Sequence, residues 1–127
     1  MKSYTDLEQS KKLVEILPVE SADMRFCFSH TLSGRTIGHY PMIGREPSMA
    51  TIPCWSLSAL YSILPNNKKE TTTLSRGGWK IEPIEYLNNW WCEYEDNSHT
   101  KDFTVSADNP VDAVFEMILK LHEQKLL

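Results

Sequence analysis

Residues 109–121 read NPVDAVFEMILKL, and this stretch carries the clearest fold signal in the chain. Asn109 is a preferred N-cap residue, Pro110 suits the first helical position, and Asp112 adds negative charge to the first turn. The apolar residues that follow recur at helical spacing: Val111, Val114, Phe115, Ile118 and Leu121. We therefore expect an amphipathic helix that starts at residue 110 and buries this stripe.

A β-hairpin is expected just before this helix. Residues 89–95 (NWWCEYE) and 102–106 (DFTVS) have strand character, and the polar connection DNSHTK suits a turn. Because side chains alternate along a strand, one face of the first strand holds Trp90, Cys92 and Tyr94, and the other holds Trp91, Glu93 and Glu95. A further strand is expected at 22–29, where Met24, Phe26 and Phe28 alternate with less apolar residues.

Two more helices are expected upstream. In the first, Thr5 and Glu8 fit a capping box, Pro18 ends the helix, and the apolar stripe is Leu7, Leu13, Val14 and Leu17. In the second, Ser56 is the N-cap and Pro65 is the stop, and Trp55 can form a hydrophobic staple with Leu60. The stripe of this second helix is Leu57, Leu60, Tyr61 and Leu64.

The remaining segments are rich in turn signals. Residues 31–53 hold three glycines and three prolines, so we expect a short strand at 36–43, turns elsewhere, and either irregular packing or a binding loop. Residues 66–69 form a polar turn that continues to residue 73. Trp79 and Ile81 then lie in a strand that Pro83 limits.

Together these segments predict one α+β domain over residues 1–127. The expected sheet is antiparallel, has about four to five strands, and carries the three helices mainly on one face.

Charge and cysteine content narrow the class of protein. Thirteen basic residues against 17 acidic ones give a net charge of −4, which disfavours charge-driven nucleic-acid binding. The three cysteines are distant from one another, and neither a signal peptide nor a membrane-length apolar run is visible. We therefore expect reduced thiols, a cytoplasmic location and no membrane partner.

Candidate reactive and metal-binding residues are few. Cys54 precedes a helix start, but its apolar neighbours favour a packed thiol over a nucleophile. Cys27 and His30 have C-x-x-H spacing, with Cys92 and His99 as the nearest further ligands, yet residues 27 and 30 point to opposite faces of a strand. We predict no metal, no cofactor and no catalytic residue.

Aromatic residues supply better candidates for binding. Because Trp90 and Trp91 face opposite sides of a strand, at least one needs cover from elsewhere in the chain or from a partner. The candidate binding residues are Trp79, Trp90, Trp91, Tyr94, His39, Tyr40 and Cys54. Glu93, Glu95, Asp96 and Asp102 are interpreted as a solvated acidic edge that protects the hairpin from edge-to-edge pairing.

Three phrases carry a resemblance: LEQSKKLVEILPVESADM (7–24), IPCWSLSALYSILP (52–65) and NPVDAVFEMILKL (109–121). They resemble a family of small uncharacterised proteins of Bacteroides-type bacteria, often encoded in prophage or mobile-element regions. The resemblance implies a bacterial accessory protein and assigns no activity. More loosely, a hairpin followed by a capped helix resembles the end of antitoxin-like proteins with a partly degraded dsRNA-binding-type fold.

Three functions remain open at this point. The leading hypothesis is a non-enzymatic accessory module that binds another protein or itself. The alternatives are a small ligand-binding protein or enzyme with a pocket near residues 31–55, and an antitoxin-like regulator. Whether the chain binds a small molecule stays unknown.

Overall fold

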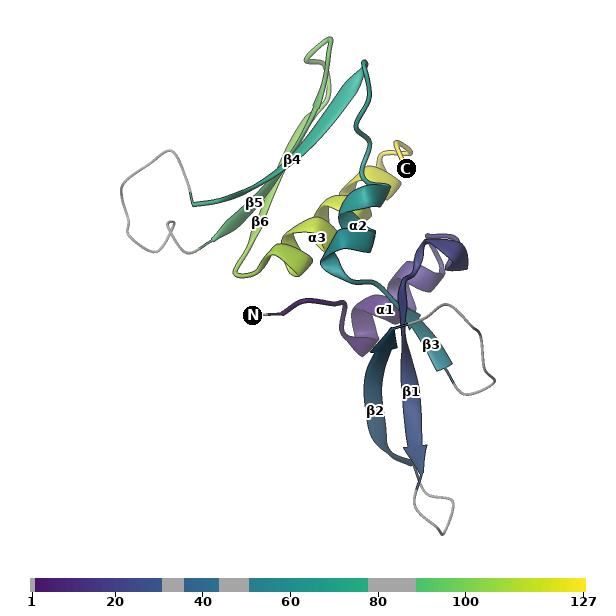
Figure 1. Ribbon diagram of the computed structural model, residues 1–127. Coiled ribbons are helices and arrows are strands. Elements are labelled where there is room, and N and C mark those ends of the chain that lie inside the picture. The colour runs from purple at the N-terminus through teal and green to yellow at the C-terminus, as the bar shows by residue number, and fades with distance from the viewer. Residues whose placement is uncertain (1, 31–35, 44–50, 78–88) are drawn as a thin grey trace.

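A computed structural model describes residues 2–30, 36–43, 51–77 and 89–127, with side chains for 2–26, 52–77 and 89–127. Its elements are α1 (Leu7–Val14), the 3-10 turn η1 (Val19–Ser21), β1 (Met24–His30), β2 (Thr36–Ile43), β3 (Thr51–Cys54), α2 (Leu57–Ile63), β4 (Glu70–Arg76), β5 (Trp90–Asp96), β6 (Asp102–Ala107) and α3 (Pro110–Glu123). The chain is an α+β protein, as expected (Figure 1).

The described strands form two antiparallel sheets in place of the single four- to five-stranded sheet that we expected. One sheet has the order β2-β1-β3 and the other β4-β5-β6. The helix α2 lies between β3 and β4 in the chain and leads from one sheet to the other (Figure 1). The helices α2 and α3 lie beside the β4-β5-β6 sheet, whereas α1 packs near β3 of the other sheet (Figure 1).

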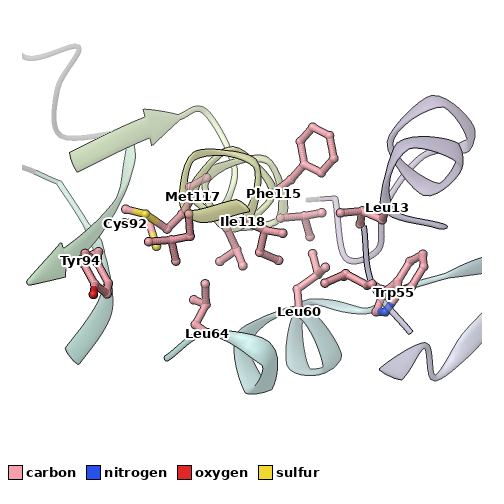
Figure 2. Close-up of a cluster of buried hydrophobic side chains, with 14 of the residues drawn as sticks. Leu13, Trp55, Leu60, Leu64, Cys92, Tyr94, Phe115, Met117 and Ile118 are labelled. Atoms are coloured by element: carbon pink, nitrogen blue, oxygen red, sulfur yellow. The ribbon is translucent and has the colours of Figure 1, made fainter. Parts of the chain in front are cut away.

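The hydrophobic core is centred on α3. All five residues of its predicted stripe are buried, and Asn109 caps the helix by accepting a hydrogen bond from the Asp112 amide at 2.8 Å. Figure 2 shows Cys92 and Tyr94 at one end of the core and Leu13 and Trp55 at the other, with α3 between them. One continuous core therefore joins the β4-β5-β6 sheet to α1 and α2.

The first helix starts one residue later than predicted. Asp6, not Thr5, is the N-cap: its carboxylate accepts from the Gln9 amide at 2.8 Å, and the Gln9 side chain accepts from the Asp6 amide at 3.0 Å. Thr5 is instead fully buried next to Trp55. The helix ends at Val14, before the stop that was predicted at Pro18, so Leu17 of the predicted stripe is buried but lies beyond the helix. Val14 was predicted to be buried with the stripe, but it is 39% exposed.

The second helix follows its predicted signals, with one exception. Ser56 is the N-cap and accepts from the Ala59 amide, and Leu64 is extended before Pro65. Trp55 and Leu60 are fully buried in the same core. Tyr61, however, is 39% exposed, and its hydroxyl donates to the Thr72 carbonyl over 3.4 Å.

Strand predictions succeeded where side chains alternate. The hairpin and β1 are confirmed, and β2 has the predicted bounds. Residues 51–53 and 70–73, predicted as turns, belong to the strands β3 and β4. The run Thr71–Thr73 is β-branched and suits a strand, although its polarity made it resemble a turn. The predicted strand around Trp79 lies outside the described residues.

Candidate interaction surface

The β4-β5-β6 sheet has a polar face on the side opposite its core face. Three cross-strand rows make up this surface, which we call the open face: Ser75–Trp91–Ser106, Thr73–Glu93–Thr104 and Thr71–Glu95–Asp102. Opposite residues of an antiparallel pair point to the same side, so the nine side chains share one surface. Seven are exposed, and Trp91 and Glu93 are half-buried.

The open face is acidic. Glu95 lies directly opposite Asp102, and Glu93 lies two residues along the central strand. The five Thr and Ser side chains on the flanking strands supply hydroxyl groups, which can donate or accept hydrogen bonds. None of the nine residues is basic. His99, in the hairpin turn, approaches this surface at Asp102, with its Nδ1 3.8 Å from Asp102 Oδ2. The surface therefore presents negative charge together with hydrogen-bonding groups on both sides of it.

The predicted acidic edge is only partly an edge. Glu93 and Glu95 lie on β5, the central strand, and Asp96 closes that strand at the hairpin turn. Only Asp102 lies on the edge strand β6, at its first position. Most of these acidic side chains therefore lie on a face of the sheet. The edge strand β6 carries no charged residue after Asp102.

The tryptophan pair is divided as the strand alternation predicts. Trp90 packs against the core, and the Arg76 guanidinium carbon lies 5.9 Å from the centre of its ring. Trp91 lies half-buried on the open face. Trp91 is therefore the candidate that shares a surface with Glu93 and Glu95, whereas Trp90 belongs to the opposite side.

Tyr94 serves the core. It is 2% exposed, its ring stacks on Phe103 with the ring centres 5.8 Å apart, and its hydroxyl donates to Glu70 Oε2 at 2.6 Å. Burial first, and then the Glu70 carboxylate that accepts this hydrogen bond, raise the pKa of Tyr94 to about 12. Tyr94 therefore ties β5 to the start of β4 and lies away from the open face.

The candidate cysteines lie inside the molecule. Cys54 and Cys92 are both fully buried. Burial, and secondarily the charge of Glu93, raise the pKa of the Cys92 thiol to about 12, which leaves very little thiolate at neutral pH. His39 and Tyr40 lie on β2, opposite Phe28 and Cys27, but their side chains and all of Trp79 lie outside the described residues.

Cys92 and His99 do not come together as the four-residue zinc arrangement would require. Cys92 is buried in the core, whereas the His99 side chain is 72% exposed in the hairpin turn. The side chains of Cys27 and His30 fall in an undescribed part of β1. Among the described residues, no three His, Cys, Asp or Glu side chains come together in a way that could hold a metal ion.

Sequence reasoning missed the β4 side of the open face. Thr71 and Thr73 flank the central carboxylates, but the segment was expected to be a turn. The available signal was the three consecutive β-branched residues at 71–73, followed two residues later by another small hydroxyl residue, Ser75.

In the described part of the chain, no helix has the length and apolar character needed to cross a membrane. No protein-family model, curated protein or solved structure matches this chain.

Proposed function

We propose that this protein is a non-enzymatic interaction module that binds a basic segment of a partner protein on the open face. The observation that carries the proposal is the acidic centre of that face, where Glu93 and Glu95 have no basic residue beside them in the three rows. A partner that supplies Lys or Arg side chains complements this charge.

The surroundings of the carboxylates suit a protein ligand. Thr73 and Thr104 stand on either side of Glu93 and offer hydroxyl groups to backbone or side-chain partners. At one end of the same face, Trp91 adds an aromatic ring, a residue type that is enriched in protein interfaces and that also attracts cations. Charge, hydrogen bonding and aromatic area thus occur on one continuous surface.

The alternatives draw less support from the described residues. An anionic face repels the phosphates of nucleic acid, which disfavours a directly nucleic-acid-binding regulator. The hypothesis of an enzyme or small ligand-binding protein named Cys54, His39 and Tyr40; the Cys54 thiol is fully buried, and the other two side chains lie outside the described residues. A bacterial accessory setting, in a prophage or mobile element, belongs to the same proposal and explains why partner binding would be the principal task.

A defined peptide tests the proposal. The probe is an extended peptide in which Lys alternates with Thr, titrated into isotopically labelled protein and followed by backbone amide shifts. We expect the shifts to concentrate on Thr73, Glu93 and Thr104. A peptide with Glu in place of Lys should leave these resonances unchanged.

A matched pair of double variants gives the control. Glu93→Gln with Glu95→Gln should weaken binding about three- to tenfold, because one exposed and one half-buried ion pair are lost. Glu15→Gln with Glu20→Gln makes the same change in net charge at exposed residues away from the sheet and should have little effect. Equal weakening in both double variants, or no binding by the wild type, would reject the proposal.

A further inference from the structure

Within the described residues, the outer edge of β6 pairs with no further strand. The Asn97 amide donates to the Lys69 carbonyl at 2.8 Å, and the Gly77 amide donates to the Asn89 carbonyl at 2.7 Å. These pairs show that odd-numbered residues of β5 bond to β4, so even-numbered residues of β5 bond to β6. Their partners on β6 are Phe103, Val105 and Ala107, which leaves the backbone groups of Asp102, Thr104 and Ser106 directed outward.

The opposite edge of the sheet is partly occupied. On β4 the same alternation directs residues 70, 72, 74 and 76 outward. Glu70 is bonded to Asn67 in both directions: the Glu70 carbonyl accepts from the Asn67 backbone amide, and the Glu70 backbone amide donates to Asn67 Oδ1. The Thr72 carbonyl accepts from the Tyr61 hydroxyl. By contrast, none of the outward backbone groups of residues 102, 104 and 106 makes a hydrogen bond with the described chain.

We propose that two copies of this chain associate through antiparallel pairing of their β6 edges, which joins the two sheets into one of six strands. This inference concerns the edge of the sheet and does not depend on partner binding at the open face. The edge has the features that favour pairing: residues 102–107 contain no proline and no glycine, their only charge is at Asp102, and they pair with β5 without a bulge.

One register of the two β6 strands forms the most hydrogen bonds between them. With Thr104 opposite Thr104 of the second copy, Asp102 lies opposite Ser106 in both directions, and all three outward residues of each strand are paired. Hydrogen-bonded pairs exchange two bonds each, so this register forms more bonds than a shift of two residues either way. It also places β-branched threonines together at the symmetry axis and keeps the two Asp102 carboxylates at opposite ends.

The helices would meet in the same dimer. The helix α3 packs over β5 and β6, and since strands lie about 4.8 Å apart, two such helices would lie roughly 10 Å apart, which is near contact distance. Lys120 Nζ lies 5.5 Å from the centre of the Phe103 ring, which places Lys120 on the β6 flank of α3. Exposed Glu116 lies one helical turn earlier.

The symmetry axis makes these charges complementary. The helix α3 begins directly after β6 and runs back along it, so Lys120 and Glu116 fall on opposite sides of the axis through Thr104. The two-fold rotation therefore places Lys120 beside Glu116 of the second copy, and the pair occurs twice. Backbone pairing and charge complementarity thus favour the same arrangement.

Two lysine substitutions on one strand test the register. Thr104→Lys sets two like charges opposite each other and should weaken the dimer about fivefold. Ser106→Lys faces Asp102 of the second copy and should strengthen the dimer about two- to fivefold. A general effect of lowering the negative charge would move both variants in the same direction. Analytical ultracentrifugation of the full chain over a wide concentration range measures both, with circular dichroism as the check on folding.

A backbone test completes the experiment. Thr104→Pro removes the outward amide but leaves the bonds to β5, and it should weaken dimer affinity by a factor of about ten or more. Thr104→Ala keeps the amide and should change dimer affinity less than about twofold. Lys120→Glu should weaken the dimer, and combining it with Glu116→Lys should restore it. The proposal would be overturned if the wild type stays monomeric at the highest concentration, or if Thr104→Pro leaves the dimer unchanged. Loss of peptide binding in the Glu93 and Glu95 variants tests only the proposal for the open face.

Discussion

The first and last helices are fixed in the same core by different means. The α1 helix has eight residues and buries only Ser10 and Leu13. The α3 helix has 14 residues and buries eight of them, all apolar. Packing of apolar area is not directional, whereas hydrogen bonds are, so the two helices should respond differently to substitution.

The position of α1 depends on a small buried polar network. Thr5 Oγ1 lies 2.8 Å from Ser10 Oγ and accepts from the Trp55 amide at 3.0 Å, and the Thr5 amide donates to the Trp55 carbonyl at 2.9 Å. Buried polar groups that lose their partners cost more free energy than a made hydrogen bond contributes. The network therefore specifies how the N-terminal segment lies against the start of α2.

The largest effect is expected from the apolar helix. Ile118→Ala should lower the free energy of unfolding by about 3 kcal/mol, because a fully buried side chain leaves a cavity in the core. Leu119→Ala, at the half-buried neighbouring position, should cost about 1 kcal/mol. Urea unfolding measures both; similar losses would contradict the view that α3 is held by its buried stripe.

A smaller loss is expected from the polar network. Thr5→Val keeps the shape of the side chain but leaves the Trp55 amide and the Ser10 hydroxyl without Thr5 Oγ1, so unfolding should become easier by about 2 kcal/mol. Thr5→Ser retains the oxygen and should cost about 0.8 kcal/mol for the lost methyl group. If the valine variant is the more stable of the two, hydrogen bonding does not position α1.

The junction between the two helices should depend on pH. Burial opposes ionisation of Asp112, but hydrogen bonds from Lys2, Gln9 and Asn109 outweigh it and hold the pKa below 3.8. A lowered pKa stabilises the folded state above the unfolded value, and this contribution is lost as the pH falls through the folded value.

Asp112→Asn tests this linkage. It should cost about 1 kcal/mol at neutral pH, since the carboxylate lies in the first turn of α3, and the difference from wild type should shrink below about pH 4. Chemical denaturation at neutral pH and at pH values below 4 measures it. A difference that stays constant with pH would show that the charge of Asp112 is not what joins α1 to α3.

The smallest effect concerns the edge of the sheet. The Tyr61 hydroxyl donates to the Thr72 carbonyl over 3.4 Å from an exposed ring, so Tyr61→Phe should change stability by less than about 0.5 kcal/mol. A loss above about 1 kcal/mol in urea unfolding would mean that polar contacts anchor α2 as well as α1.

Local patterns were sufficient for α3, for the hairpin, and for the start of α2, because each depends on neighbouring residues. They could not choose between Thr5 with Glu8 and Asp6 with Gln9, since both pairs fit a capping box. The choice is made by Trp55, fifty residues away, which occupies the Thr5 hydroxyl. Division of the strands into two sheets is likewise a matter of long-range pairing that alternation alone does not encode.

For the candidate surface, too, local patterns predicted part of the arrangement and long-range pairing decided the rest. Alternation placed Trp91, Glu93 and Glu95 on one face of a strand, and the register confirms that they share it. The flanking hydroxyl groups of β4 were missed because three polar residues in succession resemble a turn. Which side chains stand beside the carboxylates depends on strand partners that are distant in sequence.

The bond between Lys2 and Asp112 has a consequence for the order of folding. The two residues lie 110 positions apart, with Lys2 Nζ 2.8 Å from Asp112 Oδ1. Contacts of such long sequence separation form late, because the intervening loop must close first. During synthesis Lys2 is made well before α3, yet its bond to Asp112 can form only after α3 has emerged, so this contact is among the last to be made.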